Sequence, residues 1–302
     1  MVKRYITGNF LMLTLSLGLL VSGCETTLEL PNNGLPKLTI ISHLSTNGWE
    51  KQRVFVYASQ SPLDSSQFIT PANLDVEVTE LETDYSIRLE MTQEGNKSYF
   101  DFPKDFLKQG FSYSISAYAP GFESVHSTTT IPTPSTITNL NVYDVTFEPS
   151  IKNEFKSILR YKLGFNIDHF EANRYYHLVF YNRYEGFDTL LLIVDPELSD
   201  DQPFLHHYDF GILIDRNDLT PGEPLNFNFL DWVIADSELK EVYVELRTIT
   251  ESYYKYHSSL ARQLIVRQDP FAEPVTIFNN IEGGYGNFSG FSPAVSSSYL
   301  PQ

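Results

Sequence analysis

Short segments in which apolar and polar residues alternate recur along the chain, and they constrain its fold more than any other feature. A period of two places the apolar side chains on one face of a strand. In one segment Leu74, Val76 and Val78 alternate with polar residues. Segments that have the character of strands lie between turn residues at 38–43, 53–57, 74–81, 85–89, 98–100, 113–118 and 124–128. They predict an all-β chain that begins with an immunoglobulin-like antiparallel β-sandwich.

The second half of the chain carries the same strand pattern. Its segments lie at 158–165, 175–181, 190–194, 211–214, 225–229 and 241–247. A helix is expected near 250–264, where Tyr253 and His257 begin a stripe of residues at helical spacing. Either Thr248 or Thr250 can serve as its N-cap. This half is therefore predicted to be a second antiparallel β domain with one or two short helices.

Two prolines at alternate positions separate the two halves. Pro132 and Pro134 cannot donate backbone hydrogen bonds, and they force an extended backbone. The predicted domains are thus a sandwich at 37–130, a linker at 131–136 and a second β-rich domain at 137–302.

The N-terminus has the three parts of a secretory signal peptide. Lys3 and Arg4 give it positive charge, an apolar run follows, and small residues precede Cys24. The run is too short for a transmembrane helix, which needs about 20 residues. The sequence Leu-Val-Ser-Gly-Cys at 20–24 resembles the bacterial lipobox, in which cleavage precedes a lipid-modified cysteine. Residues 1–23 are therefore predicted to be a lipoprotein signal peptide.

Cys24 is predicted to anchor the mature chain to a membrane, with residues 24–36 as a lipidated tether. Several acyl chains hold a protein firmly, because each buried methylene contributes about 0.8 kcal/mol. Cys24 is also the only cysteine of the chain. The mature fold is therefore expected to have no disulfide and to be stabilised by its core alone.

The chain is strongly acidic, with 21 basic and 38 acidic residues and a formal net charge of −17. Removal of the signal peptide takes away Lys3 and Arg4, which leaves 19 basic and 38 acidic residues, or −19. Such a surface repels the phosphate backbone of nucleic acids. No nucleic-acid partner is therefore predicted.

The most suggestive polar cluster surrounds two adjacent histidines. His206 and His207 follow Asp200 and Asp201, and these residue types can bind a metal ion. Adjacent side chains of a strand point to opposite faces, so both histidines could bind one ion only from a loop. No His-x-His or His-x-x-x-His spacing accompanies them. A solvated loop is the favoured interpretation, and no metal or other cofactor is predicted.

A glycine-rich segment near the C-terminus superficially resembles a phosphate-binding loop. Gly283, Gly284 and Gly286 lie close together, but no basic residue follows them. A phosphate loop needs a following helix and usually a lysine. The segment is therefore predicted to be a turn that leads into a terminal β-strand.

Motifs in the last third resemble a known family. The run at 243–256, the Phe-Ala-Glu-Pro motif at 271–274 and the Asn-Ile-Glu-Gly-Gly motif at 280–284 are similar to the domain of unknown function 4249 family of Bacteroidota lipoproteins. The resemblance implies an outer-membrane lipoprotein, of a kind often encoded beside TonB-dependent receptors, and it assigns no catalytic residue. Glu25 and Glu29 form only part of the acidic signal that directs such lipoproteins to the cell surface. The cell surface and the periplasmic face both stay open.

Three functions follow from these features. The leading hypothesis is a non-enzymatic binding or accessory protein that works with a TonB-dependent receptor or its substrate. Tyr254 is its candidate contact with a partner, because a cluster of tyrosines cannot be buried on one helical face. The first alternative is an envelope hydrolase acting on glycan or peptide, for which a cleft with convergent carboxylates or a Ser-His pair would be the marker. The second is a structural envelope protein.

Overall fold

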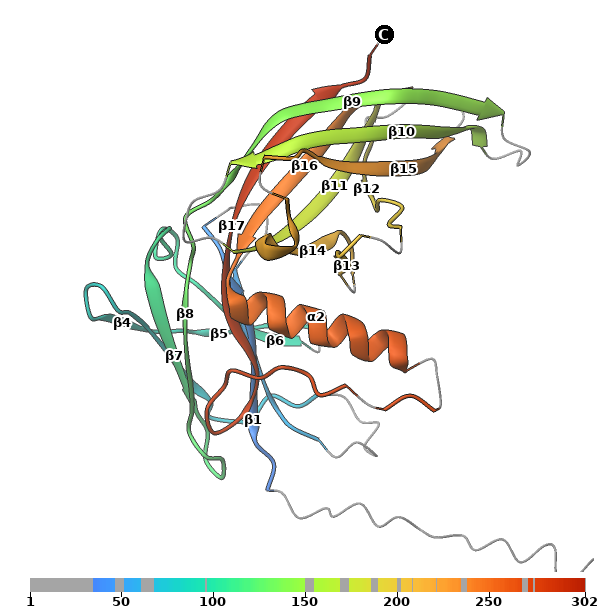
Figure 1. Ribbon diagram of the computed structural model, residues 1–302. Coiled ribbons are helices and arrows are strands. Elements are labelled where there is room, and N and C mark those ends of the chain that lie inside the picture. Colours follow the sequence, from blue (N-terminus) through green and yellow to red (C-terminus); the bar gives the residue numbers. More distant parts are fainter. Residues whose placement is uncertain are drawn as a thin grey trace, which may run out of the picture. The chain divides into compact units, whose positions relative to one another are not determined.

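The structure is a computed structural model (Figure 1). Its contacts divide the chain into a unit at Met1–Leu35 and a unit at Pro36–Gln302, and the second is described below. The predicted signal peptide, Cys24, Asp200 and Asp201 lie outside the described residues. The structure describes residues 35–46, 52–60, 68–95, 97–149, 155–168, 174–185, 190–199, 202–207, 209–220, 222–234, 238–267, 271–273 and 275–301.

One long sheet organises the unit. Its strands follow the order β13-β14-β11-β16-β17-β1-β2-β6-β5, and β12 also pairs with β11. Its members are β1 (Leu38–Leu44), β2 (Arg53–Ala58), β5 (Met91–Glu94), β6 (Lys97–Asp101), β11 (Tyr175–Glu185), β12 (Leu190–Val194), β13 (Leu205–His206), β14 (Ile212–Asp215), β16 (Glu238–Ile249) and β17 (Tyr285–Tyr299).

Two smaller sheets pack against this long sheet. The first has the order β4-β3-β7-β8 and the second the order β15-β10-β9. Their strands are β3 (Asp75–Glu80), β4 (Tyr85–Arg88), β7 (Ser112–Tyr118), β8 (Val125–Thr130), β9 (Thr136–Pro149), β10 (Phe155–Asp168) and β15 (Leu225–Ile234). Of the strand pairs described, β1 with β17 is parallel and the others are antiparallel. The prediction of a mainly antiparallel all-β chain is confirmed.

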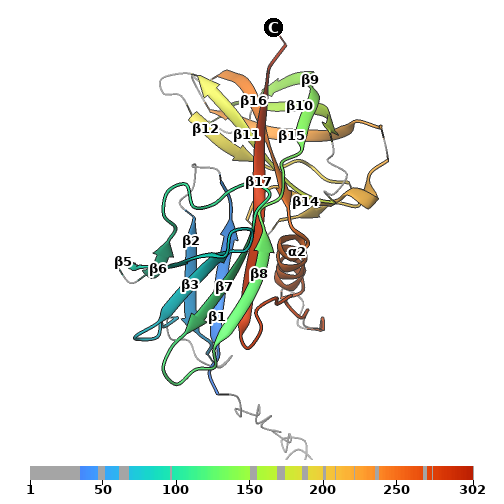
Figure 2. The same cartoon turned by 90° about the vertical axis from the view of Figure 1, so that its left-hand side faces the viewer.

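Strand β17 runs through both halves of the long sheet (Figure 2). Its first residues pair with β1, with Ile40 opposite Gly286. Its later residues pair with β16, with Ile249 opposite Phe291. The predicted turn at 283–284 and terminal strand are therefore present. The terminal strand β17 pairs with β1, which lies near the other end of the sequence.

Two hydrophobic cores fill the space between the sheets. The first consists mainly of residues between 38 and 131, and it also includes Ile281 and Phe288. The second consists of residues between 142 and 246. Alternation explains the first core directly, because every second side chain of β1, from Leu38 to Leu44, is buried.

The segment predicted as a linker is packed rather than exposed at its ends. Ile131 is fully buried, and the backbone N–H of Ser135 donates to Oγ1 of Thr248 over 2.8 Å. The hydroxyl of Ser292 donates to the carbonyl of Pro132 over 2.5 Å. These bonds join 131–136 to β16 and β17, while the division into domains at 37–130 and 137–302 stays a prediction.

Helix α2 (Glu251–Val266) lies where the sequence predicts a helix. Thr250, rather than Thr248, is its N-cap, since its hydroxyl oxygen accepts from the backbone N–H of Tyr253. Tyr253 and His257 are buried against the sheet, whereas Leu264 is exposed. The C-terminal half of α2 extends away from the sheet (Figure 1). Among the described residues, no helix has the length and apolar character needed to span a membrane.

Candidate functional site

Four of the seven histidines lie close together where α2 packs on the sheet. They come from four separate parts of the fold: His43 from β1, His177 from β11, His207 just after β13 and His257 from α2. The ring centroids of His177 and His207 are 4.5 Å apart, those of His207 and His257 are 4.6 Å apart, and those of His43 and His257 are 4.8 Å apart. We name these four residues the histidine cluster.

Hydrogen bonds fix the proton positions in part of this cluster. Nε2 of His177 lies 3.0 Å from the carbonyl oxygen of Phe210, so Nε2 carries the proton and donates it. Nδ1 of His177 then accepts from the hydroxyl of Tyr253 over 3.1 Å. His177 is thereby held in its neutral form.

Hydrogen bonds fix the proton positions of His207 and His257 in the same way. The backbone N–H of Asp209 donates to Nδ1 of His207 over 3.2 Å. A neutral His207 therefore carries its proton on Nε2, which donates to Nδ1 of His257 over 2.9 Å. The chain of bonds joins the loop after β13 to α2.

Burial keeps the cluster uncharged. It lowers the pKa of His43 to about 4 and that of His207 to about 3. Burial likewise holds the pKa of His177 and His257 well below the ordinary value of 6.5. The nearby guanidinium of Arg247 adds to each shift, since a cation disfavours a second positive charge. Such rings are poor general bases at neutral pH.

The predicted metal residues do not come together within the described structure. His206 is exposed, whereas His207 is buried in the cluster, as expected for neighbours on a strand. Among the described residues, no group of three or more His, Cys, Asp or Glu side chains is arranged to hold a metal ion. No local pattern in the sequence marks His43 or His177, because each stands alone in its own strand.

A Ser-His pair, the marker named for a hydrolase, also occurs here. Oγ of Ser289 lies 2.7 Å from Nδ1 of His43, and the two residues are register partners of the parallel β17–β1 pair. Ser289 has no exposed surface, so a substrate carbonyl cannot reach its hydroxyl in this arrangement. The pair acts as a cross-strand tie, and the hydrolase alternative stays a prediction.

An open groove adjoins the histidine cluster on the outer face of β1, β2 and β6. It consists of two hollows, of about 500 Å³ and about 620 Å³, which share Ile41, Arg53 and Phe55. We name it the outer-face groove. It is lined by Ile41, Ser42, His43, Gln52, Arg53, Phe55, Tyr57, Glu94, Lys97, Tyr99, Arg247, Tyr253 and Phe291.

Aromatic rings and one guanidinium form the floor of this groove. Phe55 stacks on Tyr57 with centroids 6.2 Å apart, and meets Tyr99 edge-on at 6.1 Å. The guanidinium carbon of Arg53 lies 3.7 Å from the centre of the Tyr99 ring. Nε of Arg53 also pairs with Asp101 over 3.4 Å. The sequence predicts this strand but not that one of its faces is open.

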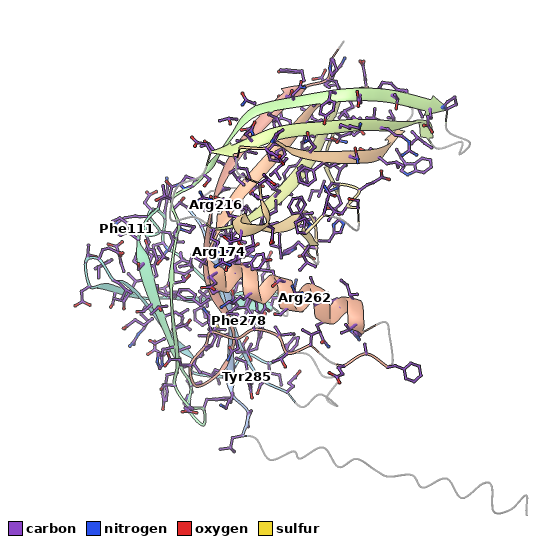
Figure 3. The ribbon with its side chains drawn as sticks, viewed as in Figure 1. Phe111, Arg174, Arg216, Arg262, Phe278 and Tyr285 are labelled. Carbon is purple, nitrogen blue, oxygen red and sulfur yellow. The ribbon has the colours of Figure 1, made fainter. Side chains whose placement is uncertain are left out.

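Tyr254, the predicted partner contact, lies outside the lining of the groove. Its half-buried ring stacks on Tyr175 with centroids 4.6 Å apart. Arg174, labelled in Figure 3, lies 5.0 Å from the Tyr175 ring and pairs with Asp215 over 2.8 Å. The contacts of Tyr254 are those of a packing residue, and its role toward a partner stays a prediction.

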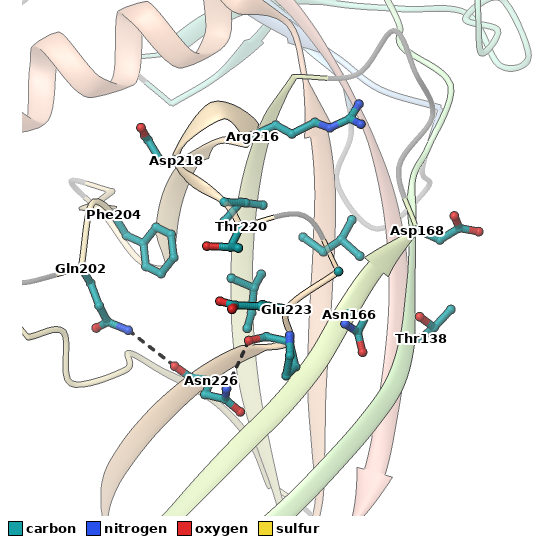
Figure 4. Close-up of a pocket in the computed structure, with 15 residues that line it drawn as sticks. Thr138, Asn166, Asp168, Gln202, Phe204, Arg216, Asp218, Thr220, Glu223 and Asn226 are labelled. Carbon is teal, nitrogen blue, oxygen red and sulfur yellow. Dashed lines mark hydrogen bonds between the residues drawn. The ribbon is translucent and has the colours of Figure 1, made fainter.

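A separate hollow, of about 560 Å³, lies at the edge of the second core (Figure 4). We name it the mouth pocket. Its walls come from β9, β10, the segment before β13, and the stretch from the short 3-10 helix η1 (Arg216–Asp218) to β15. It is lined by Thr138, Asn166, Ile167, Asp168, Gln202, Phe204, Arg216, Asp218, Leu219, Thr220, Gly222, Glu223, Pro224, Leu225 and Asn226.

Comparison with known proteins identifies one family. A search of the curated proteins found no match to this chain. The family model described as domain of unknown function (DUF4249) matches residues 25–297. That match begins directly after Cys24, includes the histidine cluster, the outer-face groove and the mouth pocket, and ends within β17. The resemblance inferred from the C-terminal motifs is therefore confirmed, and the chain belongs to the DUF4249 family.

Proposed function

We propose that the chain is a lipid-anchored outer-membrane protein without enzymatic activity, which binds a TonB-dependent receptor or that receptor's substrate. The outer-face groove is the binding site in this proposal. The observation that carries it is an open groove lined by Phe55, Tyr57, Tyr99 and Arg53. Tyrosine and arginine are the residue types that contribute most to protein interfaces.

The groove is organised before any ligand arrives. Arg53 is held by Asp101 below it and by the Tyr99 ring beside it, and a second pairing joins its Nη2 to Glu94 over 3.8 Å. Phe55 and Tyr57 stack on each other. A ligand therefore orders few side chains on binding, which lowers the entropic cost of association.

The anchor places this groove near a membrane. A tether of residues 24–36 reaches at most about 45 Å when fully extended, at roughly 3.5 Å per residue. The groove begins on β1, directly after the tether. A receptor embedded in the same membrane is therefore within reach of the groove, and a freely diffusing cytoplasmic partner is not.

Replacement of Arg53 by glutamate is expected to abolish recovery of the partner. The lipidated protein would be purified from detergent-solubilised outer membranes, and proteins that accompany it would be identified by mass spectrometry. Wild type is expected to bring down a β-barrel receptor, and Arg53→Glu and Phe55→Ala at least tenfold less of it. Reversed charge at Arg53 repels an anionic contact, and loss of the Phe55 ring removes an apolar surface from the groove.

Lys104→Glu is the matched control, because Lys104 is exposed and lies outside the groove lining. It changes the net charge by the same amount and is expected to recover the receptor like wild type. Recovery of no β-barrel protein by wild type would contradict the proposal. Equal recovery of the receptor by Arg53→Glu and Lys104→Glu would show that the outer-face groove is not the binding site.

A further inference from the structure

The mouth pocket differs chemically from the outer-face groove. Nine of its fifteen lining residues have side chains that form hydrogen bonds: three carboxylates, three amides, two threonine hydroxyls and one guanidinium. Figure 4 shows Thr220 and Glu223 near its centre, with Asn166 and Thr138 on the side of β9 and β10. The walls thus carry both donors and acceptors. A ligand that fits them must itself both donate and accept hydrogen bonds.

Hydroxyl groups meet that requirement. Each hydroxyl donates one hydrogen bond and accepts two, whereas an ammonium only donates and a phosphate at neutral pH mainly accepts. Amides and carboxylates can each bond two neighbouring hydroxyls at once. A polyhydroxylated ligand therefore matches Asn166, Glu223 and Gln202 better than an ion of either sign.

The charge of the pocket lining narrows the class of ligand further. Asp168, Asp218 and Glu223 line the pocket against the single cation of Arg216, which leaves a formal excess of two negative charges. An anionic ligand would meet this excess at close range, where like charges repel. Acidic sugars and phosphorylated compounds are therefore disfavoured.

One aromatic ring completes the lining. Phe204 packs on Phe227, with ring centroids 5.7 Å apart, and belongs to the partly buried margin of the second core. Its remaining surface faces the pocket in Figure 4. A fixed aromatic surface beside polar walls suits a ring that is polar at its edge and carries C–H groups on its face.

Neighbouring bonds hold parts of the wall in place. Oδ1 of Asn226 accepts from the hydroxyl of Tyr143 over 3.0 Å, and Nδ2 of Asn226 donates to the carbonyl of Pro224 over 3.1 Å. Oε1 of Gln202 accepts from the backbone N–H of Ser199 over 3.0 Å. We propose that the mouth pocket is a binding site for an uncharged saccharide. This inference does not depend on the proposed receptor partnership, since it concerns a different hollow.

The test uses the full lipidated chain, purified in a detergent without a sugar headgroup so that the detergent cannot occupy the site. Binding would first be screened on an array of neutral and acidic glycans. Affinity for the best neutral oligosaccharide would then be measured by calorimetry, beside an acidic oligosaccharide of equal length and spermine as a cationic probe. The expected result is binding of neutral glycans and none of the other two probes.

Two variant pairs locate the binding. Phe204→Leu keeps the apolar packing but removes the ring, and Phe147→Leu is its control, because Phe147 is 58% exposed on β9 and outside the pocket. Glu223→Ala removes one carboxylate, and Glu123→Ala is its control at an exposed position. Phe204→Leu and Glu223→Ala are each expected to weaken binding at least tenfold, and the controls less than twofold.

Several results would overturn the proposal. Absence of any neutral glycan from the bound set would do so, as would binding of the acidic probe or of spermine at equal or higher affinity. Equal affinity in the pocket variants and their controls would place the saccharide elsewhere. Because Glu223 is exposed, its variant is expected to fold, and it keeps the test decisive even if Phe204→Leu does not.

Discussion

Acidification from pH 7.5 to pH 5.5 is expected to lower the free energy of unfolding by several kcal/mol. The cause is the histidine cluster, whose four rings have folded-state pKa values far below 6.5. In the unfolded chain these rings take up protons near pH 6.5. Between pH 6.5 and about 4 the unfolded state therefore binds more protons than the folded state, and stability falls as pH falls.

The size of the effect follows from the same linkage. One pH unit below 6.5, each ring that stays neutral in the fold contributes a loss of about 1.4 kcal/mol. Four such rings give roughly 5 kcal/mol, which is comparable to the whole stability of many domains. Paired carboxylates do not interfere, because the pKa of Asp215 and Glu241 is lowered and their contribution is lost only at more acidic pH. The charged neighbour of the cluster, Arg247, pairs with Glu245 over 2.8 Å, and its guanidinium keeps its charge throughout this window.

Two adjacent residues, His206 and His207, provide a matched test of this pH dependence. His207→Gln removes one titrating ring from the cluster, and His206→Gln removes an exposed ring next to it in sequence. Urea unfolding at pH 7.5, 6.5 and 5.5 would give the loss of stability for each protein. His207→Gln is expected to reduce that loss by about a quarter, and His206→Gln to leave it unchanged. A wild-type free energy of unfolding that does not vary between pH 7.5 and 5.5 would refute this account.

Replacement of Gly286 by alanine is expected to cost at least about 4 kcal/mol, a size reached by few single substitutions. Gly286 has a φ of +113°, and a Cβ at this position would lie 1.9 Å from the carbonyl oxygen of Ile40. That oxygen belongs to the backbone of β1, so no side-chain rotation relieves the clash. The substitution forces β17 away from β1, at the one parallel pair of the described sheets.

Thermal unfolding would measure this cost, and the expected drop in Tm is about 10 °C or more. Gly121→Ala is the control, because Gly121 also has a positive φ, of +86°, but among the described residues beyond its two chain neighbours no heavy atom lies within 4 Å of the point that its Cβ would occupy. That variant carries only the backbone strain, about 1 kcal/mol. Similar melting temperatures for the two variants would show that the close approach of β17 and β1 is not what requires glycine.

The sequence predicts the strands well, because their pattern is local. The alternation at 38–43 and 74–81 and the cap at Thr250 depend on residues close together in the chain. The order of strands in the sheet is different. Nothing near β1 indicates that its neighbour is β17, about 250 residues later, since a parallel pair carries no turn to mark it. The predicted boundary at 131–136 likewise could not reveal its bonds to Thr248 and Ser292.

The sites depend even more on distant residues. His207 drew attention only because it follows His206, whereas its partners His177 and His257 lie in other elements. The outer-face groove arises because α2 covers β17 and leaves β2, which lies on the other side of β1, open. The alternation of Arg53 and Phe55 along one strand predicts that they share a face, but not which face meets solvent.

The position of β17 also governs when the protein can finish folding. Strand β1 stands near the start of the chain, yet one of its edges is closed only by residues 285–290. The first core likewise lacks Ile281 and Phe288 until those residues are present. The N-terminal half therefore cannot complete its structure while the chain is still emerging, and its unpaired edge needs protection during that time. A product that stops short of β17 keeps that edge open, so truncated chains expose a strand that proteases can recognise.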